Sequence, residues 1–428
     1  MKIALYFDDK SFNKKDFRNP EIGNPGIGGT PFCFLMLAKY YTELYQKDEI
    51  LFYHEADNKQ NIFSDSYKVI TVAPKKIVEQ CIIDKIDFLV ITHSKYIQCA
   101  SLLESSHVQC IVWVHNFLTY DYLLLLRRNK SATRIVFVGK EQYDRYIDDP
   151  IIKKSVCIMN MYNTECYEYT RTDPNTRIVT YTGAIVPGKG FHYLAKYWKK
   201  ILKKVPEAEL YVMGTGALYN NKVKLGRFGI AEEKYENQFM KYLLDDKGEI
   251  IPSVHFLGLV GSEKINYFQK TRLGIINPTA RTEICPISVL EMASCEIPVV
   301  SRNKNGMPDV IINGETGILI ENSSDFCSAV VKLLLDDELN VCYGKAAKSF
   351  VQKQFNPQII AEKWHNLFVD TKNKLYPPYQ RPTCNYKNNY KYLRILNRNL
   401  RKLPCLKWLP SVALIECKIK SILVFLGK

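Results

Sequence analysis

The sequence predicts an α/β protein with two consecutive domains, each built on a parallel sheet covered by helices. Short apolar runs rich in β-branched and aromatic residues alternate with amphipathic helical stretches along the chain. A polar stretch at residues 169–176 interrupts this alternation, which then restarts. The length of 428 residues suits two or three domains. Strands alternating with helices indicate parallel sheets with helices on both faces.

The first domain is predicted over residues 1–168. One helix is expected at residues 31–45, behind a first strand that ends at Asp8 and Asp9. The buried strands are expected at residues 3–7, 88–92, 109–114, 134–138 and 153–158.

The second domain is predicted over residues 169–354. Its strands are expected at residues 177–182, 209–213, 254–257, 273–276, 297–301 and 317–320. Its helices are expected at residues 191–204, 287–295 and 324–335. A further helix at 357–369, within the segment 355–375, is expected to close this second domain.

Residues 376–428 form a linker and a basic amphipathic tail. From Lys391 to Lys428 the tail holds nine Lys or Arg and a single acid, Glu416, together with many large apolar residues around Trp408. Pro404 and Pro410 should divide it into two or three short pieces. Such a tail could lie on an anionic membrane surface, or it could be a helix docked on the protein with its basic residues outward; the pattern leaves both open.

Composition excludes several classes of protein. Hydrophobic residues make up 46% and charged residues 24%, which excludes a mostly disordered chain, a collagen-like chain and a polytopic membrane protein. The formal charge of +15 indicates an anionic partner or a solvated basic surface. No apolar run reaches the ~20 residues that span a bilayer, and the first residues lack the features of a secretory signal.

Thirteen cysteines include no CxxC pair, so we predict no zinc site and no other metal site. Scattered cysteines without a secretory signal favour free thiols in the cytoplasm. The adjacent acids at 8–9, 148–149 and 245–246 do not form a DxD triplet, and we interpret them as helix caps or surface acids.

Three loops carry the candidate chemistry. In the glycine-rich loop at 23–30, ahead of a helix, the amides of Gly28 and Gly29 could approach an anion, although such loops are often simple turns. The turn at 183–190 places Lys189 near a helix N-terminus, where it could hold a phosphate or be merely solvated. The loop at 277–286 leads into a helix, so that Glu283 and Glu291 could face one pocket at the strand ends.

In this order and spacing, these patterns resemble the retaining nucleotide-sugar glycosyltransferases of family four, glycosyl transferases group 1. The Glu-x7-Glu motif of that family matches Glu283 and Glu291. Further matches are the turn at 183–190, the glycine loop at 26–30, the inter-domain stretch at 160–167 and the blocks at 298–309 and 313–317. The resemblance covers about residues 1–370 and implies the GT-B architecture, in which two Rossmann-like domains face each other across a cleft.

The resemblance also implies roles for individual residues. Glu283 should contact the donor-sugar hydroxyls, Glu291 the nucleotide ribose, and Lys189 the leaving diphosphate. Gly28 and Gly29 should present amides to the donor phosphate or the acceptor, and Ile287 should line the donor site. His115 follows a strand where the family often places a histidine near the sugar, although a lone histidine is often structural. No cofactor is implied, because the nucleotide sugar is a substrate.

Two departures from the family pattern stand out. The family usually has an arginine where this chain has Ala184, and we hypothesise that Arg281 replaces it. The residues after Glu283 are Ile284, Cys285 and Pro286 where the family often has glycines, which changes the shape of the sugar pocket.

The sequence therefore favours a metal-independent transferase that moves a sugar to a saccharide or lipid-linked acceptor, in bacterial surface polysaccharide or lipopolysaccharide assembly. It would work in the cytoplasm, peripherally at the inner membrane, with the tail at 391–428 against anionic lipid. One alternative is a GT-B sugar-nucleotide epimerase. Another is a basic membrane- or nucleic-acid-binding protein without catalysis, although the body of the chain lacks the interleaved basic and aromatic residues of nucleic-acid binders.

Overall fold

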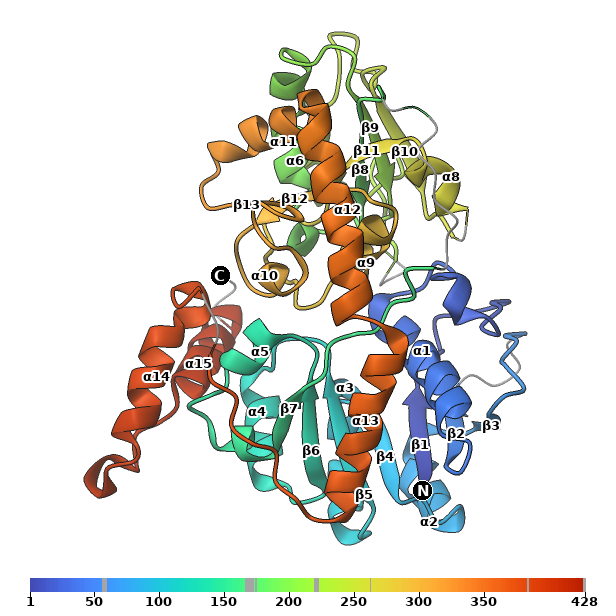
Figure 1. Cartoon of the computed structure of the whole chain (residues 1–428), viewed down its shortest axis with the longest axis vertical. Coiled ribbons are helices and arrows are strands. Elements are labelled where there is room, and N and C mark those ends of the chain that lie inside the picture. Colours follow the sequence, from blue (N-terminus) through green and yellow to red (C-terminus); the bar gives the residue numbers. More distant parts are fainter. Residues whose placement is uncertain are drawn as a thin grey trace. The chain divides into compact units, whose positions relative to one another are not determined.

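Two parallel sheets organise the chain, which we describe from a computed structural model (Figure 1). The structure describes residues 1–55, 60–165, 173, 175–218, 223–261, 263–382 and 385–425. The chain divides into two units. Unit 1 comprises Met1–Pro20, Thr30–Met161 and Pro357–Lys428, and unit 2 comprises Glu21–Gly29 and Tyr162–Asn356. The predicted domain boundary at residues 168–169 lies outside the described residues and stays a prediction.

The sheet of unit 1 has the strand order β3-β2-β1-β4-β5-β6-β7, and neighbouring strands run parallel. Near-continuous apolar sequence in the central strands follows from burial on both faces. The strands are β1 (Lys2–Phe7), β2 (Glu49–His54), β3 (Lys68–Thr71), β4 (Phe88–Thr92), β5 (Gln109–Val114), β6 (Ala132–Phe137) and β7 (Ser155–Cys157). The predicted strands are confirmed to within two residues, whereas β2 and β3 were not predicted.

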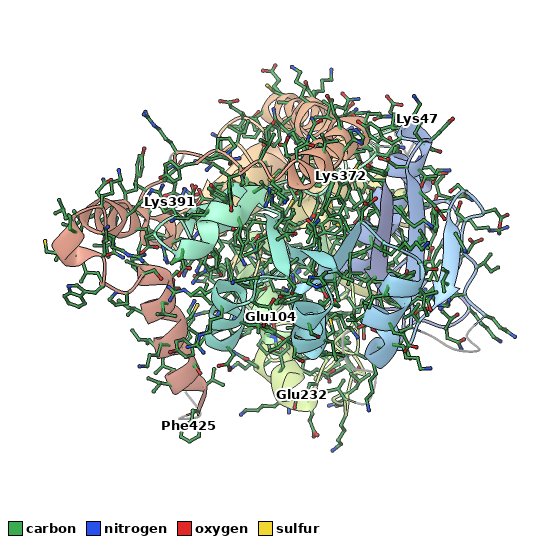
Figure 2. The ribbon with its side chains drawn as sticks, turned by 90° about the horizontal axis from the view of Figure 1, so that it is seen from below. Lys47, Glu104, Glu232, Lys372, Lys391 and Phe425 are labelled. Carbon is green, nitrogen blue, oxygen red and sulfur yellow. The ribbon has the colours of Figure 1, made fainter. Side chains whose placement is uncertain are left out.

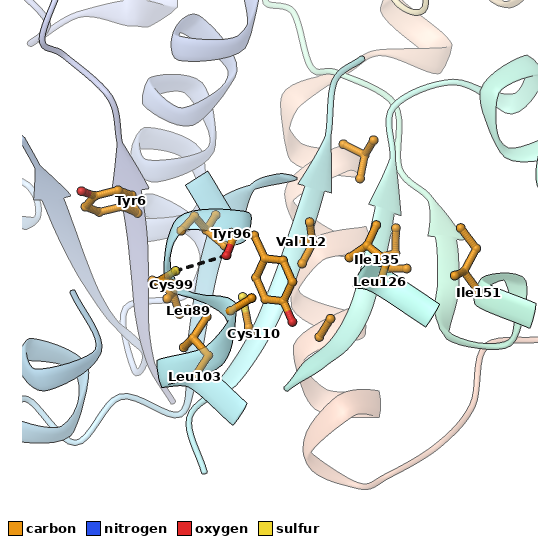
Figure 3. Packing of buried hydrophobic residues seen from close by; sticks show 14 of the residues in the cluster. Tyr6, Leu89, Tyr96, Cys99, Leu103, Cys110, Val112, Leu126, Ile135 and Ile151 are labelled. Atoms are coloured by element: carbon orange, nitrogen blue, oxygen red, sulfur yellow. Dashed lines mark hydrogen bonds between the residues drawn. The ribbon is translucent and has the colours of Figure 1, made fainter. Parts of the chain in front are cut away.

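Helices cover both faces of this sheet. They are α1 (Gly29–Leu44), α2 (Ile77–Ile83), α3 (His93–Ser105), α4 (Tyr120–Arg128), α5 (Lys140–Asp144) and α13 (Pro357–Lys372), with 3-10 turns η1 (Pro20–Ile22), η2 (Pro74–Lys76) and η3 (Pro150–Lys154). On one face, residues of α2, α3 and α4 pack on the strands in the core that Figure 3 shows in part, including Leu89, Leu103 and Val112.

Helix α13 corrects one expectation. We expected the helix at 357–369 to close the second domain, but it belongs to unit 1. Its aromatic side chains explain why: Trp364 lies 4.8 Å from Trp113 of β5, and Phe368 lies 5.6 Å from Phe88 of β4, between ring centroids. Burying two large aromatic rings against the first sheet outweighs the continuity of this helix with unit 2 in the sequence.

The sheet of unit 2 has the parallel order β10-β9-β8-β11-β12-β13. Its strands are β8 (Ile178–Thr182), β9 (Glu209–Met213), β10 (Val254–Gly258), β11 (Thr271–Ile275), β12 (Val299–Arg302) and β13 (Gly317–Ile320), all at or near the predicted positions. Its helices are α6 (Phe191–Leu202), α7 (Glu233–Met240), α8 (Lys264–Phe268), α9 (Ile287–Ser294), α10 (Met307–Val310), α11 (Asp325–Leu335) and α12 (Asp337–Gln354), with the 3-10 turn η4 (Pro187–Lys189).

The C-terminal tail folds onto unit 1 in short helical pieces, as the two prolines predict. The pieces are η5 (Asn388–Tyr390), α14 (Lys391–Leu400), η6 (Pro404–Leu406) and α15 (Val412–Phe425). Ala413 and Cys417 of α15 enter the same core as α4. No helix in the described part of the chain combines the length and the apolar character needed to cross a membrane.

Candidate active site

The site of unit 2 lies where its strand order reverses. Strands β8 and β11 are neighbours at the centre of the sheet, and the chain proceeds from β8 towards β10 on one side and from β11 towards β13 on the other. Ligands of open α/β sheets bind outside the carboxyl ends of the strands at such a switch point. The turn with Lys189 follows β8 and the loop with Glu283 follows β11, so two of the three predicted loops meet there.

Lys189 and Glu283 form an ion pair at this point. The Lys189 Nζ lies 2.6 Å from the Glu283 Oε1, and the Asn277 Nδ2 donates to the same oxygen at 2.9 Å. The carboxylate is 6% exposed, whereas the lysine side chain is 24% exposed. The ammonium group is therefore the more accessible partner, and it can turn towards an anion above the strand ends.

Hydrogen bonds to the backbone tie the two loops together. The Asn277 Nδ2 also donates to the carbonyl of Gly188 at 3.0 Å, and the Thr282 Oγ1 donates to it at 3.2 Å. Gly190 has a φ of +71°, and a Cβ there would lie 2.9 Å from Thr279, so glycine suits this turn for both reasons. The loop after β11 thus holds the turn that carries Lys189.

The backbone of the loop after β11 is unusual. Asn277 and Ala280 have φ values of +36° and +50°, a region that costs a residue with a Cβ about 1–3 kcal/mol. Asn305 secures this shape, because its Nδ2 donates to the carbonyls of Ala280 at 2.8 Å and Arg281 at 3.1 Å. A Cβ on Gly306 would lie 1.7 Å from the carbonyl oxygen of Ile284, so the block at 298–309 supports the Glu283 loop directly.

Glu291 forms a second, buried ion pair with Lys264, a residue that was not predicted from the sequence. The Lys264 Nζ of α8 lies 2.6 Å from the Glu291 Oε1 of α9, and both side chains are buried. Two carboxylates with lysine partners thus stand on α9 and on the loop leading into it. Such carboxylates can accept hydrogen bonds from hydroxyl groups, and the ammonium groups can neutralise phosphate.

The glycine loop packs beside the start of α9. The segment Glu21–Gly29 belongs to unit 2, and a Cβ on Gly29 would lie 3.4 Å from the Ile287 Cγ1. The Asn24 Oδ1 accepts hydrogen bonds from the amides of Gly26 and Ile27, which shapes the loop ahead of Gly28. Gly28 is half-buried and Gly29 exposed, so this loop can approach a ligand without side chains in the way.

Arg281 is exposed on the loop after β11, whereas Ala184 is buried after β8. Burial, together with the charge of Arg281, lowers the pKa of His192 on α6. The guanidinium therefore acts electrostatically near the start of α6, beside the turn that carries Lys189. This position is compatible with a phosphate contact for Arg281, which stays a hypothesis.

His115 belongs to unit 1, whereas the other candidates belong to unit 2. It follows β5, with its ring 4.6 Å from that of Trp113. Burial, with a smaller effect of nearby His93, lowers the pKa of His115 to about 3, so the imidazole is neutral at physiological pH. Its Nε2 is buried without a hydrogen-bond partner among the described residues.

The interpretation of the adjacent acids at 8–9, 148–149 and 245–246 as helix caps or surface acids is correct only in part. Asp245 is exposed and accepts turn amides, and Asp149 caps η3, as expected. Asp9, Asp148 and Asp149 are buried, however, and are not surface acids. The reason is tertiary pairing: Asp9 accepts from the Glu55 amide, and the other two hold the C-terminal tail.

Comparison with known proteins identifies the C-terminal half of the chain. Residues 168–350 match the family model "Glycosyl transferases group 1". The capsular polysaccharide biosynthesis glycosyltransferase CapM of Staphylococcus aureus is 27% identical over 194 residues, which are 45% of each chain. The D-inositol 3-phosphate glycosyltransferase of Corynebacterium jeikeium is 27% identical over 46% of this chain and 44% of its own. The chain thus matches about half the length of these curated relatives.

Solved structures extend the likeness to the whole fold. Alr3699/HepE from Anabaena, solved in complex with UDP and glucose, is 16% identical and covers 86% of this chain and all of its own, with a TM-score of 0.65. The chain therefore has the GT-B fold, with two Rossmann-like units, as the sequence predicted.

Proposed function

We propose that this protein is a retaining glycosyltransferase that moves a sugar from a nucleotide-sugar donor to an acceptor hydroxyl. The observation that carries the proposal is the pairing of Lys189 with Glu283 and of Lys264 with Glu291 around one switch point. A cation that can leave its carboxylate and carboxylates that can accept hydroxyl groups suit a sugar diphosphate.

In the proposed reaction the bond between the anomeric carbon and the phosphate oxygen breaks, and a bond to the acceptor oxygen forms on the same face. The acceptor proton passes to the leaving phosphate. Lys189 exchanges Glu283 for the diphosphate and stabilises the charge that develops there. Glu283 then accepts hydrogen bonds from the donor sugar. The backbone amides of Gly28 and Gly29 assist at the phosphate or the acceptor.

The remaining candidates bind or orient the donor. Glu291 accepts from the ribose hydroxyls and Ile287 lines the donor site. Arg281 adds positive charge in place of the arginine missing at Ala184. Neutral His115 offers to the sugar an Nε2 that has no hydrogen-bond partner among the described residues. No residue in this scheme requires a metal ion.

We further propose a UDP-sugar donor and an acceptor that is a saccharide or a lipid-linked saccharide in bacterial surface polysaccharide or lipopolysaccharide assembly. The names of the relatives support this assignment: CapM is named for capsular polysaccharide biosynthesis, and HepE was solved with UDP and glucose. The enzyme would be cytoplasmic and attach peripherally to the inner membrane through residues 391–428.

A screen of nucleotide sugars tests the proposal, with thermal stabilisation and donor hydrolysis as readouts. We expect one nucleotide sugar to stabilise the wild type, Glu291→Gln to weaken that effect, and Glu283→Gln to lower turnover at least 100-fold. Glu233→Gln is the matched control, because Glu233 pairs with Lys224 on the surface. If no nucleotide or nucleotide sugar stabilises the wild type, the proposal fails. Conversion of the donor to an isomer without acceptor would instead establish the epimerase alternative.

A further inference from the structure

The tail helix α14 is oriented opposite to an ordinary surface helix, because its charged side faces the protein. Lys391 and Arg394 are fully buried, and Arg398 and Arg401 donate to backbone carbonyls of residues 147 and 148. These four residues recur every three to four positions and therefore share one side of the helix. Four of the nine basic residues of the tail are thus used inside the protein.

The acidic partners lie in residues 141–149 and in α15. Lys391 pairs with Glu141 and, at 3.1 Å, with Asp144. The Arg394 Nη2 lies 2.6 Å from the Glu416 Oε2. Figure 2 shows Lys391 where the tail meets the rest of unit 1, and Phe425 at the far end of α15. The docked arrangement and an outward lipid-binding face are therefore compatible.

The opposite side of α14 carries an exposed apolar stripe. At 100° per residue, Leu393 lies about 120° and Leu396 about 180° from the centre of the basic side, and Leu396 is 56% exposed. On α15, Ile415, Ile419 and Ile422 are also exposed and share one side of the helix. Trp408, between the two helices, is 75% exposed. A helix pair with charges inward and large apolar residues outward favours a partner that covers the apolar surface.

The charges of the tail indicate which kind of partner covers this apolar surface. Between residues 385 and 425 the exposed cations are Lys387, Lys402, Lys407, Lys418 and Lys420. The single acid of this stretch, Glu416, is paired with Arg145 and Arg394 on its inner side and with Lys420 at 2.8 Å. A second copy of this chain would bring the same lysines together, at a net charge of +15 per chain. An anionic bilayer matches both properties, with phosphate for the lysines and an acyl boundary for the apolar stripe and the tryptophan.

We propose that the outward face of α14, η6 and α15, here called the tail face, seats the protein on an anionic lipid bilayer. The tail face comprises Leu393, Leu396, Lys402, Lys407, Trp408, Ile415, Ile419 and Ile422. The inference rests on the proposed peripheral attachment and names the side chains that carry it. The buried basic residues hold the tail to the protein and do not contact lipid.

The full-length protein reports this binding through its own fluorescence. Of its four tryptophans, Trp113, Trp198 and Trp364 are fully buried, so a change in emission on adding lipid reports Trp408. We expect a blue shift and co-sedimentation with vesicles of phosphatidylcholine and phosphatidylglycerol, but not with phosphatidylcholine alone. Added salt should weaken the binding, and Trp408→Phe should abolish the blue shift.

Paired variants identify the side chains involved. Lys402→Gln with Lys407→Gln should weaken vesicle binding about 30-fold, because each lysine near an anionic surface contributes about a factor of five. Leu393→Gln with Leu396→Gln should weaken it about tenfold. The matched controls, Lys75→Gln with Lys76→Gln and Ile82→Gln with Ile83→Gln, change exposed residues near and on α2 and should leave binding unchanged. Unchanged thermal unfolding confirms that each variant folds.

Three results would overturn the inference. The first is equal binding by the tail-face and α2 variants, and the second is no vesicle binding by the wild type. The third is concentration-dependent self-association of the wild type that Leu393→Gln with Leu396→Gln removes, which would make a second copy the occupant. Donor binding is measured on the same proteins without lipid. A wild type that binds the donor but no vesicles contradicts the tail face alone, and a wild type that binds no donor contradicts the transferase proposal.

Discussion

The buried ion pairs of unit 2 and those of the tail are built from the same residue types but in different surroundings. In unit 2, Lys189 meets Glu283 at the open ends of β8 and β11. In unit 1, tail residues such as Lys391 form ion pairs with buried carboxylates between packed helices. The comparison teaches that the Lys189–Glu283 pair at the strand ends can exchange one partner for a ligand, whereas the pairs of the tail, enclosed between packed helices of unit 1, hold structure. The cost of removing a buried partner should differ accordingly.

The largest expected effect comes from Lys391→Met. It leaves the buried carboxylate of Glu141 without its ammonium partner and removes one of the two lysine partners of Asp144, which keeps Lys140, so the free energy of unfolding should fall by about 3–5 kcal/mol. Denaturant unfolding measures the change. Lys402→Met, at an exposed lysine of the same tail, should change it by less than about 0.5 kcal/mol. Equal effects of the two substitutions would show that the tail is not anchored by this pair.

The second largest expected effect is a pH-dependent contribution of Glu416 to the free energy of unfolding. Burial acts to raise the pKa of Glu416, but Arg145, Lys420 and Arg394 outweigh it and lower the pKa to about 2. A depressed carboxylate pKa stabilises the fold above the unfolded pKa of about 4.5, and this contribution is lost as the pH falls towards 2. It amounts to about 3 kcal/mol. The stability difference between wild type and Glu416→Gln should therefore shrink from pH 5 to pH 2; a constant difference contradicts the assignment.

The Lys264→Met variant tests the Lys264–Glu291 ion pair of unit 2. Without the ammonium group, the buried carboxylate of Glu291 loses its charge partner, so donor affinity should fall about 30-fold. Lys264→Arg should retain most of the affinity. Calorimetry with the stabilising nucleotide measures the effect. Lys224→Met, which breaks a surface pair with Glu233, is the control.

Arg281→Ala should have the smallest effect, because the guanidinium is exposed and screened by solvent. We expect the donor KM to rise about fivefold with kcat nearly unchanged, as for a phosphate contact made equally in ground and transition states. Arg177→Ala, just ahead of β8 at the opposite edge of the sheet, should leave KM unchanged. An unchanged KM in Arg281→Ala removes this residue from the donor site.

The sheets were largely predictable because their strands are buried on both faces. Strands β4, β5, β9 and β13 appear at the predicted residues, where short apolar runs leave little choice of structure. Strand β3 was missed because it is a four-residue strand at the edge of the sheet with no buried residue. Helix α12 was missed because its buried positions include Asn340, Gly344 and Ala347, which give no apolar period.

The sequence alone determined the strand–helix order, the residues at the strand ends and the excess of basic residues in the tail. These are local properties, since periodicity, turn residues and charge are read within a few positions of the chain. The tertiary structure decided which polar side chains meet: Lys264 with Glu291 and Asn277 with Glu283 in the site, and Lys391 with residues far earlier in the chain. It also decided that the basic side of α14 faces inward, because only folding brings the acids of residues 141–149 beside it.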